Sequence, residues 1–73
     1  MTYLENQTTY CVYCINAFAN KYDISPKQAF NYLYRFGGID FLVECYDAEH
    51  QLSLEDAIGD LTIVCRRNGG ALE

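Results

Sequence analysis

Two cysteines three positions apart, Cys11 and Cys14 in the stretch TTYCVYCINAF, have the most obvious chemical potential in this chain. A redox-active C-x-x-C lies at the start of a helix that follows a strand, where the helix dipole lowers the thiol pKa. These two fall inside a helical pattern with no strand before it. A structural zinc site needs a second pair of ligands at regular spacing, whereas Cys45 and Cys65 are isolated. We therefore expect all four thiols to pack as small apolar side chains, and zinc binding by Cys11 and Cys14 is the alternative.

A set of carboxylates near the single histidine is the second group that could do chemistry. Asp40, Glu44 and Asp47 are spaced so that they share one face of a helix. Asp47 and His50 resemble half of a helical carboxylate metal site, but a complete site needs inward-facing Glu residues that the other segments do not supply. We therefore expect an acidic stripe that faces solvent or a partner, with His50 capping a helix end or bonding a loop carbonyl.

Nothing in the sequence indicates catalysis. No hydroxyl nucleophile has a recognisable base beside it. The pairs Gly37-Gly38 and Gly69-Gly70 follow predicted helices rather than strands, so neither is typical of a phosphate-binding loop. We expect no enzymatic activity, no cofactor and no metal.

The first half of the chain predicts two helices. One amphipathic stripe has members at intervals of seven, four, three and four residues: Leu4, Cys11, Ile15, Phe18 and Tyr22. This helix should end near Tyr22. A second helix should start at Ser25, with Pro26 in its first position and Gln28 completing a capping box, and should end at Gly37-Gly38. Its expected apolar side consists of Ala29, Phe30, Leu33 and Phe36.

The second half predicts two more helices. Residues 39–50, IDFLVECYDAEH, are apolar on most sides, so this helix should lie in the middle of a bundle. Ser53 to Asp56 reads as another capping box, and Asn68-Gly69-Gly70 ends the last helix after Arg66 and Arg67. Its apolar positions are Leu54, Ala57, Ile58, Leu61, Val64 and Cys65. The prediction is an all-α, compact bundle of four short helices, a single domain over residues 1–70, with 71–73 as a C-terminal tail whose Leu72-Glu73 is typical of a cloning remnant.

The composition and net charge of the chain limit the kinds of partner and the cellular compartment that we expect. The chain is 51% hydrophobic and 15% aromatic, and its net charge is -5. Residues 37–65 carry seven acids and no Lys or Arg, which disfavours nucleic acid and anionic membranes and suits a basic partner or simple solubility. The start MTYLENQTTY lacks the pattern of a secretory signal, and no apolar run approaches the roughly 18 residues of a membrane span. We therefore expect a cytoplasmic protein with reduced thiols.

Four short motifs carry a resemblance to a known family. They are I-S-x-K-x-A at 24–29, F-G-G-I-D-F at 36–41, E-C-Y-D-x-x-H at 44–50 and L-E-D-A-I at 54–58. With them the chain resembles a bacterial family of small proteins known as domain of unknown function 3791. The resemblance implies a small cytoplasmic helical protein. Because members are often encoded beside ADP-ribosyltransferase-like proteins, it also implies a partner-binding, antitoxin-like role.

The leading interpretation is a protein–protein interaction module that associates with itself or with a neighbouring protein. Tyrosine suits interfaces because it buries a large area while keeping a polar tip. The residues expected to contact a partner are Tyr10, Tyr13, Tyr32, Asp40, Glu44, Asp47 and His50, and Tyr3 and Tyr34 are further candidates for exposure. The alternative is a DNA-binding helix-turn-helix within 23–37, with Lys27, Asn31 and Arg35 along one side, which the acidic net charge disfavours.

Overall fold

The computed structural model describes residues 3–70, with side chains from Asn6 onward, and this part of the chain contains five helices and no strand. They are α1 (Tyr3–Tyr22), α2 (Pro26–Arg35), α3 (Gly38–Glu44), α4 (Tyr46–Glu49) and α5 (Leu54–Arg67). The all-α prediction is confirmed. The predicted tail at 71–73 and the side chains of Tyr3 and Leu4 lie outside the described part.

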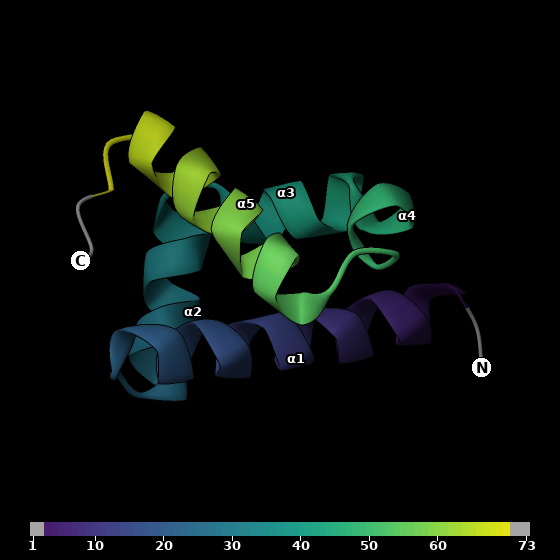
Figure 1. Ribbon diagram of the computed structural model, residues 1–73, viewed down its shortest axis with the longest axis horizontal. Coiled ribbons are helices and arrows are strands. Elements are labelled where there is room, and N and C mark those ends of the chain that lie inside the picture. Colours follow the sequence, from purple (N-terminus) through teal and green to yellow (C-terminus); the bar gives the residue numbers. More distant parts are fainter. Residues whose placement is uncertain (1–2, 71–73) are drawn as a thin grey trace.

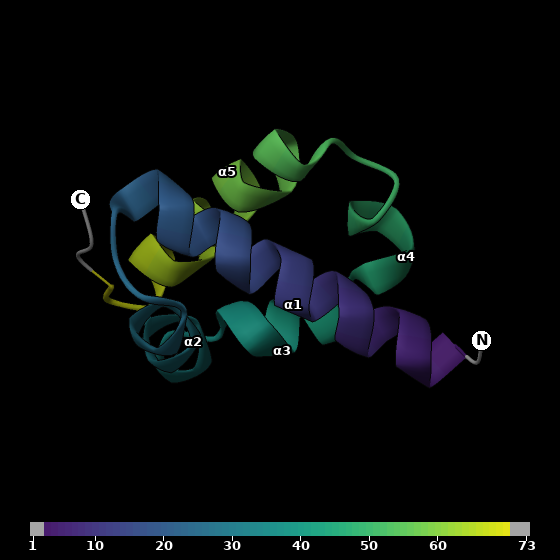
Figure 2. The ribbon, with the colours of Figure 1, turned by 90° about the horizontal axis from the view of Figure 1, so that it is seen from below.

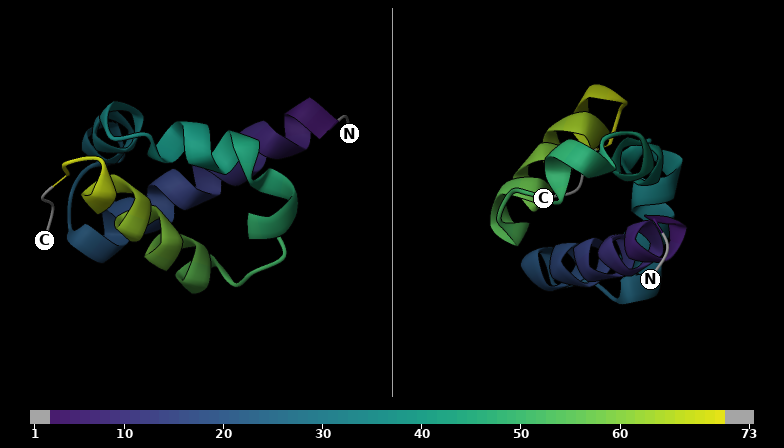
Figure 3. Two further views of the ribbon diagram at one scale, coloured as in Figure 1. Left: turned by 90° about the horizontal axis from the view of Figure 1, so that it is seen from above. Right: turned by 90° about the vertical axis from the view of Figure 1, so that its right-hand side faces the viewer.

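The longest helix, α1, runs along one side of the molecule, and the other helices pack against it (Figure 1). Seen from below, α1 crosses in front, with α3 and α5 behind it (Figure 2). α2, α3 and α5 all contact α1, and α3 also contacts α5. Two further views show α3 and α5 covering α1 from the opposite side (Figure 3). The core therefore lies between α1 and the layer formed by the later helices.

The start of α2 is fixed by local hydrogen bonds, as the sequence predicts. The Gln28 N–H donates to Ser25 Oγ at 3.1 Å, and the Ser25 N–H donates to Gln28 Oε1 at 2.9 Å. Pro26 occupies the first helical position. Beyond the helix end, Gly37 has a φ of 80°, a conformation that glycine adopts without strain. The predicted capping box and glycine stop are confirmed.

The predicted single helix over 39–50 is wrong. The backbone leaves helical geometry at Cys45, where φ is −105° and ψ is 20°, and α4 begins in a new direction. The change of direction lets the Tyr46 ring pack against Tyr10 of α1 while Glu49 faces Asp60 of α5. Within residues 3–70 the predicted third helix is therefore divided into α3 and the four-residue α4, and the other three predicted helices are each present as one helix.

The core is small and contains two of the cysteines. The fully buried side chains are Phe18, Leu33, Leu42, Leu61, Cys14 and Cys65. All four cysteines are free, and Cys11 and Cys45 are half-buried. The prediction that Cys14 and Cys65 pack as apolar side chains is confirmed.

Three residues placed on apolar faces by the sequence are instead exposed. Phe30 on α2, Val43 on α3 and Leu54 on α5 are 43%, 46% and 42% accessible. α3 still lies in the middle of the bundle as predicted, because it contacts α1, α2, α4 and α5, although Val43 on its outer side is exposed. In a chain this short there is not enough interior for every apolar side chain.

None of the helices described between residues 3 and 70 combines the length and the apolar character that a membrane-spanning helix needs.

Candidate functional site

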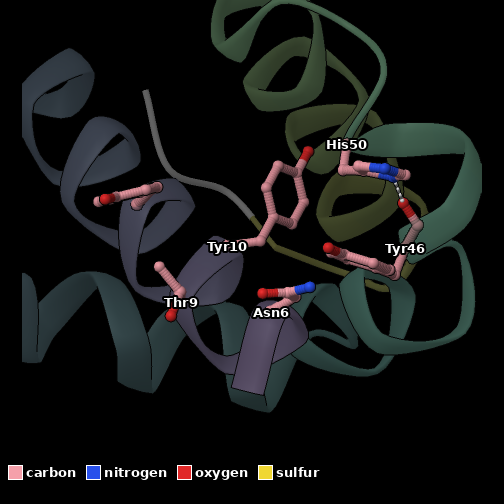
Figure 4. A pocket seen from close by; sticks show the side chains of 6 residues that line it. Asn6, Thr9, Tyr10, Tyr46 and His50 are labelled. Carbon is pink, nitrogen blue, oxygen red and sulfur yellow. Dashed lines mark hydrogen bonds between the residues drawn. The ribbon is translucent and has the colours of Figure 1, made fainter. Parts of the chain in front are cut away.

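A pocket of about 300 Å³ opens between the N-terminal half of α1 and α4 (Figure 4). It is lined by Asn6, Thr9, Tyr10, Tyr13, Tyr46 and His50. The four residues from α1 recur at helical spacing and therefore share one face of that helix. Tyr46 and His50 are four apart, at the start and just beyond the end of α4. Two helices far apart in the sequence thus each present one face to the same space.

The aromatic rings of the pocket have fixed relative orientations. The Tyr46 and His50 rings are stacked, with centroids 4.4 Å apart and an interplanar angle of 8°. The Tyr10 ring stands across this stack, 5.6 Å from Tyr46 at 75° and 6.5 Å from His50 at 83°. Such edge-to-face pairs contribute about 0.5–1.5 kcal/mol beyond their buried area. The rings therefore help to hold α4 against α1.

His50 is oriented by its own helix. Its Nδ1 lies 2.7 Å from the Tyr46 carbonyl oxygen. A carbonyl oxygen only accepts, so the proton is on Nδ1, which donates. Because Tyr46 belongs to α4 and His50 follows its last residue, this contact matches the first of the two expectations, that His50 caps a helix end.

The Tyr10 hydroxyl is buried beneath the pocket. It lies beside the Cys14 thiol, a weak hydrogen-bonding group, and makes no hydrogen bond of normal geometry within the described residues. The pKa of Tyr10 is raised well above its usual range, first by burial and then by the Cys14 thiol and the Glu49 carboxyl group. Burial likewise raises the pKa of Cys14 to about 11. Cys14 is therefore a thiol at neutral pH, which suits packing better than metal binding or redox chemistry.

Sequence reasoning missed Glu49, the buried acid behind the pocket. Glu49 is 7% exposed, and burial, followed by a hydrogen bond and repulsion from Asp60, raises its pKa to about 7. Its Oε1 has no hydrogen-bond partner among the described residues. The sequence did contain a signal for this burial. Glu49 follows Leu42 and Tyr46 at helical spacing, so it lies on the same side as these buried residues and not on the side of the exposed acids.

Of the predicted partner-contacting residues, three come together and the others do not. Tyr10, Tyr13 and His50 line the pocket. The carboxylates Asp40, Glu44 and Asp47 are all exposed, as is Tyr34.

Tyr10 and Tyr32 are half-buried rather than exposed. Tyr10 is half-buried, with its ring at the pocket and its hydroxyl in the interior. Tyr32 is half-buried on α2, where its ring stacks on Phe18 and contacts Phe36. The expectation of exposure is wrong for Tyr32, because its ring closes over the core.

The two alternative functions depend on other residues. Lys27, Asn31 and Arg35 of the DNA-binding alternative are exposed on α2. For zinc, the part of the chain from Asn6 to Gly70 holds no group of three His, Cys, Asp or Glu side chains that could bind a metal ion.

A second hollow, of about 270 Å³, lies between α1, α2 and α3. Its lining is uncharged and mainly apolar: Gln7, Thr8, Cys11, Val12, Ile15, Phe30 and Val43. The exposed Phe30 and Val43 noted above belong to this surface.

Comparison with known proteins identifies the family. The family model described as "Protein of unknown function (DUF3791)" matches residues 9–68. No curated protein and no solved structure matches the chain. The chain belongs to the DUF3791 family, which confirms the resemblance carried by its four motifs.

Proposed function

We propose that this DUF3791-family chain is a protein-interaction module whose aromatic pocket receives a basic side chain, Lys or Arg, from a partner protein. The observation that carries the proposal is the convergence of four rings, from Tyr10, Tyr13, Tyr46 and His50, on one pocket. Aromatic residues are enriched in protein–protein interfaces, where they combine large contact area with polar tips.

The charge of the chain supports a basic ligand. Tyr46 and His50 belong to the stretch 37–65, which has seven acids and no Lys or Arg. This excess attracts a basic surface and raises the rate at which it meets the protein. Among the residues that the structure describes, no Lys or Arg lines the pocket. An incoming ammonium or guanidinium group is therefore not opposed by a neighbouring positive charge.

The pocket has both fixed and adaptable parts. Tyr46 is buried and stacked on His50, so its position is set before binding. Tyr13 is 60% exposed and can move over a ligand. A cation over the face of a Tyr ring gains about 0.5–2 kcal/mol, depending on how far it is desolvated. Asn6 and Thr9 add side-chain oxygens that can accept hydrogen bonds from a guanidinium group.

The proposal is tested by NMR titration of the ¹⁵N-labelled protein with a peptide that alternates Arg and Gly. We expect shifts centred on Asn6, Thr9 and His50, and weaker binding at higher salt. Tyr13→Ala should weaken binding about threefold to tenfold, from the loss of roughly 1 kcal/mol of cation–π attraction, whereas Tyr13→Phe should bind like the wild type.

The matched control is Tyr34→Ala, which removes another exposed tyrosine, on α2, that is 68% accessible. It should leave the affinity unchanged. Equal weakening by Tyr34→Ala, or equal binding of a peptide with Glu in place of Arg, would overturn the proposal.

A further inference from the structure

The second hollow lies on a different side of α1 from the aromatic pocket. α2 and α3 lie on one side of α1, and α4 with the start of α5 lies on the other (Figures 2 and 3). We call this hollow of about 270 Å³ the apolar groove; α1 contributes five of its lining residues, α2 contributes Phe30 and α3 contributes Val43. The lining residues of the groove and of the aromatic pocket are different. A molecule seated in the groove therefore leaves the pocket open.

The apolar groove exposes large apolar side chains from all three of its helices. Val12 of α1, Phe30 of α2 and Val43 of α3 are all exposed to solvent. The Phe30 ring is stacked on that of Tyr34, with the centroids 5.9 Å apart, so the same surface continues along α2. A contiguous apolar surface of this kind on a small protein is typical of an interaction site.

Contacts within the chain hold the groove in shape. The Gln7 side chain is buried, and its Nε2 donates a hydrogen bond of 3.2 Å to the Val43 carbonyl oxygen. This bond joins α1 to α3 at the groove. On α2, the stack with Tyr34 restricts the Phe30 ring. A surface that is ordered before binding loses less conformational entropy when a partner covers it.

The two helices beside the groove carry opposite charge. Lys27 lies one turn before Phe30 on α2, whereas on α3 Asp40 lies one turn before Val43 and Glu44 follows it. All three charged side chains are exposed. A partner surface of one uniform charge would be attracted by one of these helices and repelled by the other.

A second copy of the chain matches both helices at once. A twofold axis that runs along the groove places α2 of one copy opposite α3 of the other, and the same contact forms again with the copies exchanged. Lys27 of each copy then faces the acids on α3 of the other copy. Charge complementarity of this kind fixes the orientation of two partners.

We propose that the apolar groove is the interface of a homodimer, in which the Phe30–Tyr34 edge of α2 from each copy covers the groove of the other copy. The dimer buries apolar surface that a chain of this length cannot cover by itself. It carries two open aromatic pockets, and it forms whichever ligand those pockets take, because the two hollows share no lining residue.

The dimer is tested by sedimentation equilibrium over a wide range of protein concentration, with a reducing agent present so that no disulfide links the copies. We expect the average mass to rise with concentration from that of one chain towards that of two. Phe30→Ser should weaken the dimer at least tenfold, because each dimer loses two Phe30 rings. The matched control is Ile63→Ser, which replaces an exposed apolar residue on α5 and should leave dimerisation unchanged. Circular dichroism checks that both variants are folded.

Reversal of charge tests the orientation of the two copies. Lys27→Glu alone and Asp40→Lys alone should each weaken the dimer about threefold to tenfold at low salt, because each change affects two contacts per dimer. The double variant should recover most of the wild-type affinity, which a variant that only disturbs the fold would not do.

Three results would overturn the proposal. The first is a wild-type protein that stays monomeric at every concentration, which would assign the groove to a different protein. The second is equal dimerisation of Phe30→Ser and the wild type. The third is a double charge variant that is weaker than both single variants. A monomer that still binds the peptide of Arg and Gly would overturn the dimer and leave the proposed function of the aromatic pocket standing.

Discussion

Replacing Tyr10 by Phe should stabilise the protein. The Tyr10 hydroxyl is buried and makes no hydrogen bond of normal geometry within the described residues. An unsatisfied buried hydroxyl costs about 1–3 kcal/mol. The Cys14 thiol beside it recovers a small part of this cost, so we expect Tyr10→Phe to raise the free energy of unfolding by about 1 kcal/mol. The ring, and its packing against Tyr46, are retained.

Tyr22→Phe is the matched control, with the opposite expected sign. The Tyr22 hydroxyl and Thr62 Oγ1 form a hydrogen bond of 2.9 Å between α1 and α5. Deleting this oxygen should lower the free energy of unfolding by about 1 kcal/mol. Both variants remove a single oxygen atom from a half-buried tyrosine of the same helix. They should therefore differ by about 2 kcal/mol.

The assay is urea and thermal unfolding followed by far-UV circular dichroism. It is done at a pH below the Glu49 pKa of about 7, so that the carboxyl group of Glu49 is protonated. For a domain of this size, 1 kcal/mol moves Tm by roughly 4–8 °C. Tyr10→Phe should melt higher than the wild type and Tyr22→Phe lower. If Tyr10→Phe were as destabilised as Tyr22→Phe, the Tyr10 hydroxyl would have a stabilising partner in the folded protein and the reasoning would be refuted.

Two further changes test the local and the packed parts of the fold. Ser25→Ala removes the side-chain cap of α2, so it should lower the free energy of unfolding by about 1 kcal/mol, measured by urea titration. Leu61→Ala leaves a cavity at a fully buried position of α5 and should cost about 2–5 kcal/mol. Because that loss is a large fraction of the stability of so short a chain, circular dichroism should show partial unfolding even without denaturant. Leu52→Ala, at an exposed site, is the control and should leave the free energy of unfolding nearly unchanged. An equally large loss from Leu52→Ala would show that burial is not the cause of the effect at Leu61.

Local signals were sufficient to place most of the helices. The end of the first helix at Tyr22 and the start of the second after Ser25 agree with the structure. Capping boxes, N-terminal proline and glycine stops act within a few residues, so they can be read without knowing the fold. The burial of Cys65 was also predictable, because it lies on the predicted apolar stripe of its helix. In the first helix the prediction placed Cys11 on the stripe, yet Cys11 is half-buried and Cys14, beside the stripe, is fully buried.

The candidate site was predictable only in part. Tyr10, Tyr13 and His50 were chosen as interface residues from composition and spacing, and they do lie at one pocket. Tyr46 was not predicted as an interface residue, because in the sequence it is one of many apolar residues in the segment 39–50. Glu49 was overlooked because its sequence neighbours are polar, although its helical neighbours are buried.

The sequence by itself determined where helices begin and end and which residues face inward along most of them, because these properties depend on neighbours within about one or two turns. Only the tertiary structure decided the break at Cys45, the meeting of Tyr10 with Tyr46, and the burial of Glu49. Each of these depends on how separate helices pack. The backbone turned at Cys45 because a buried ring and a buried acid had to be placed against two different helices, a requirement that no local pattern encodes.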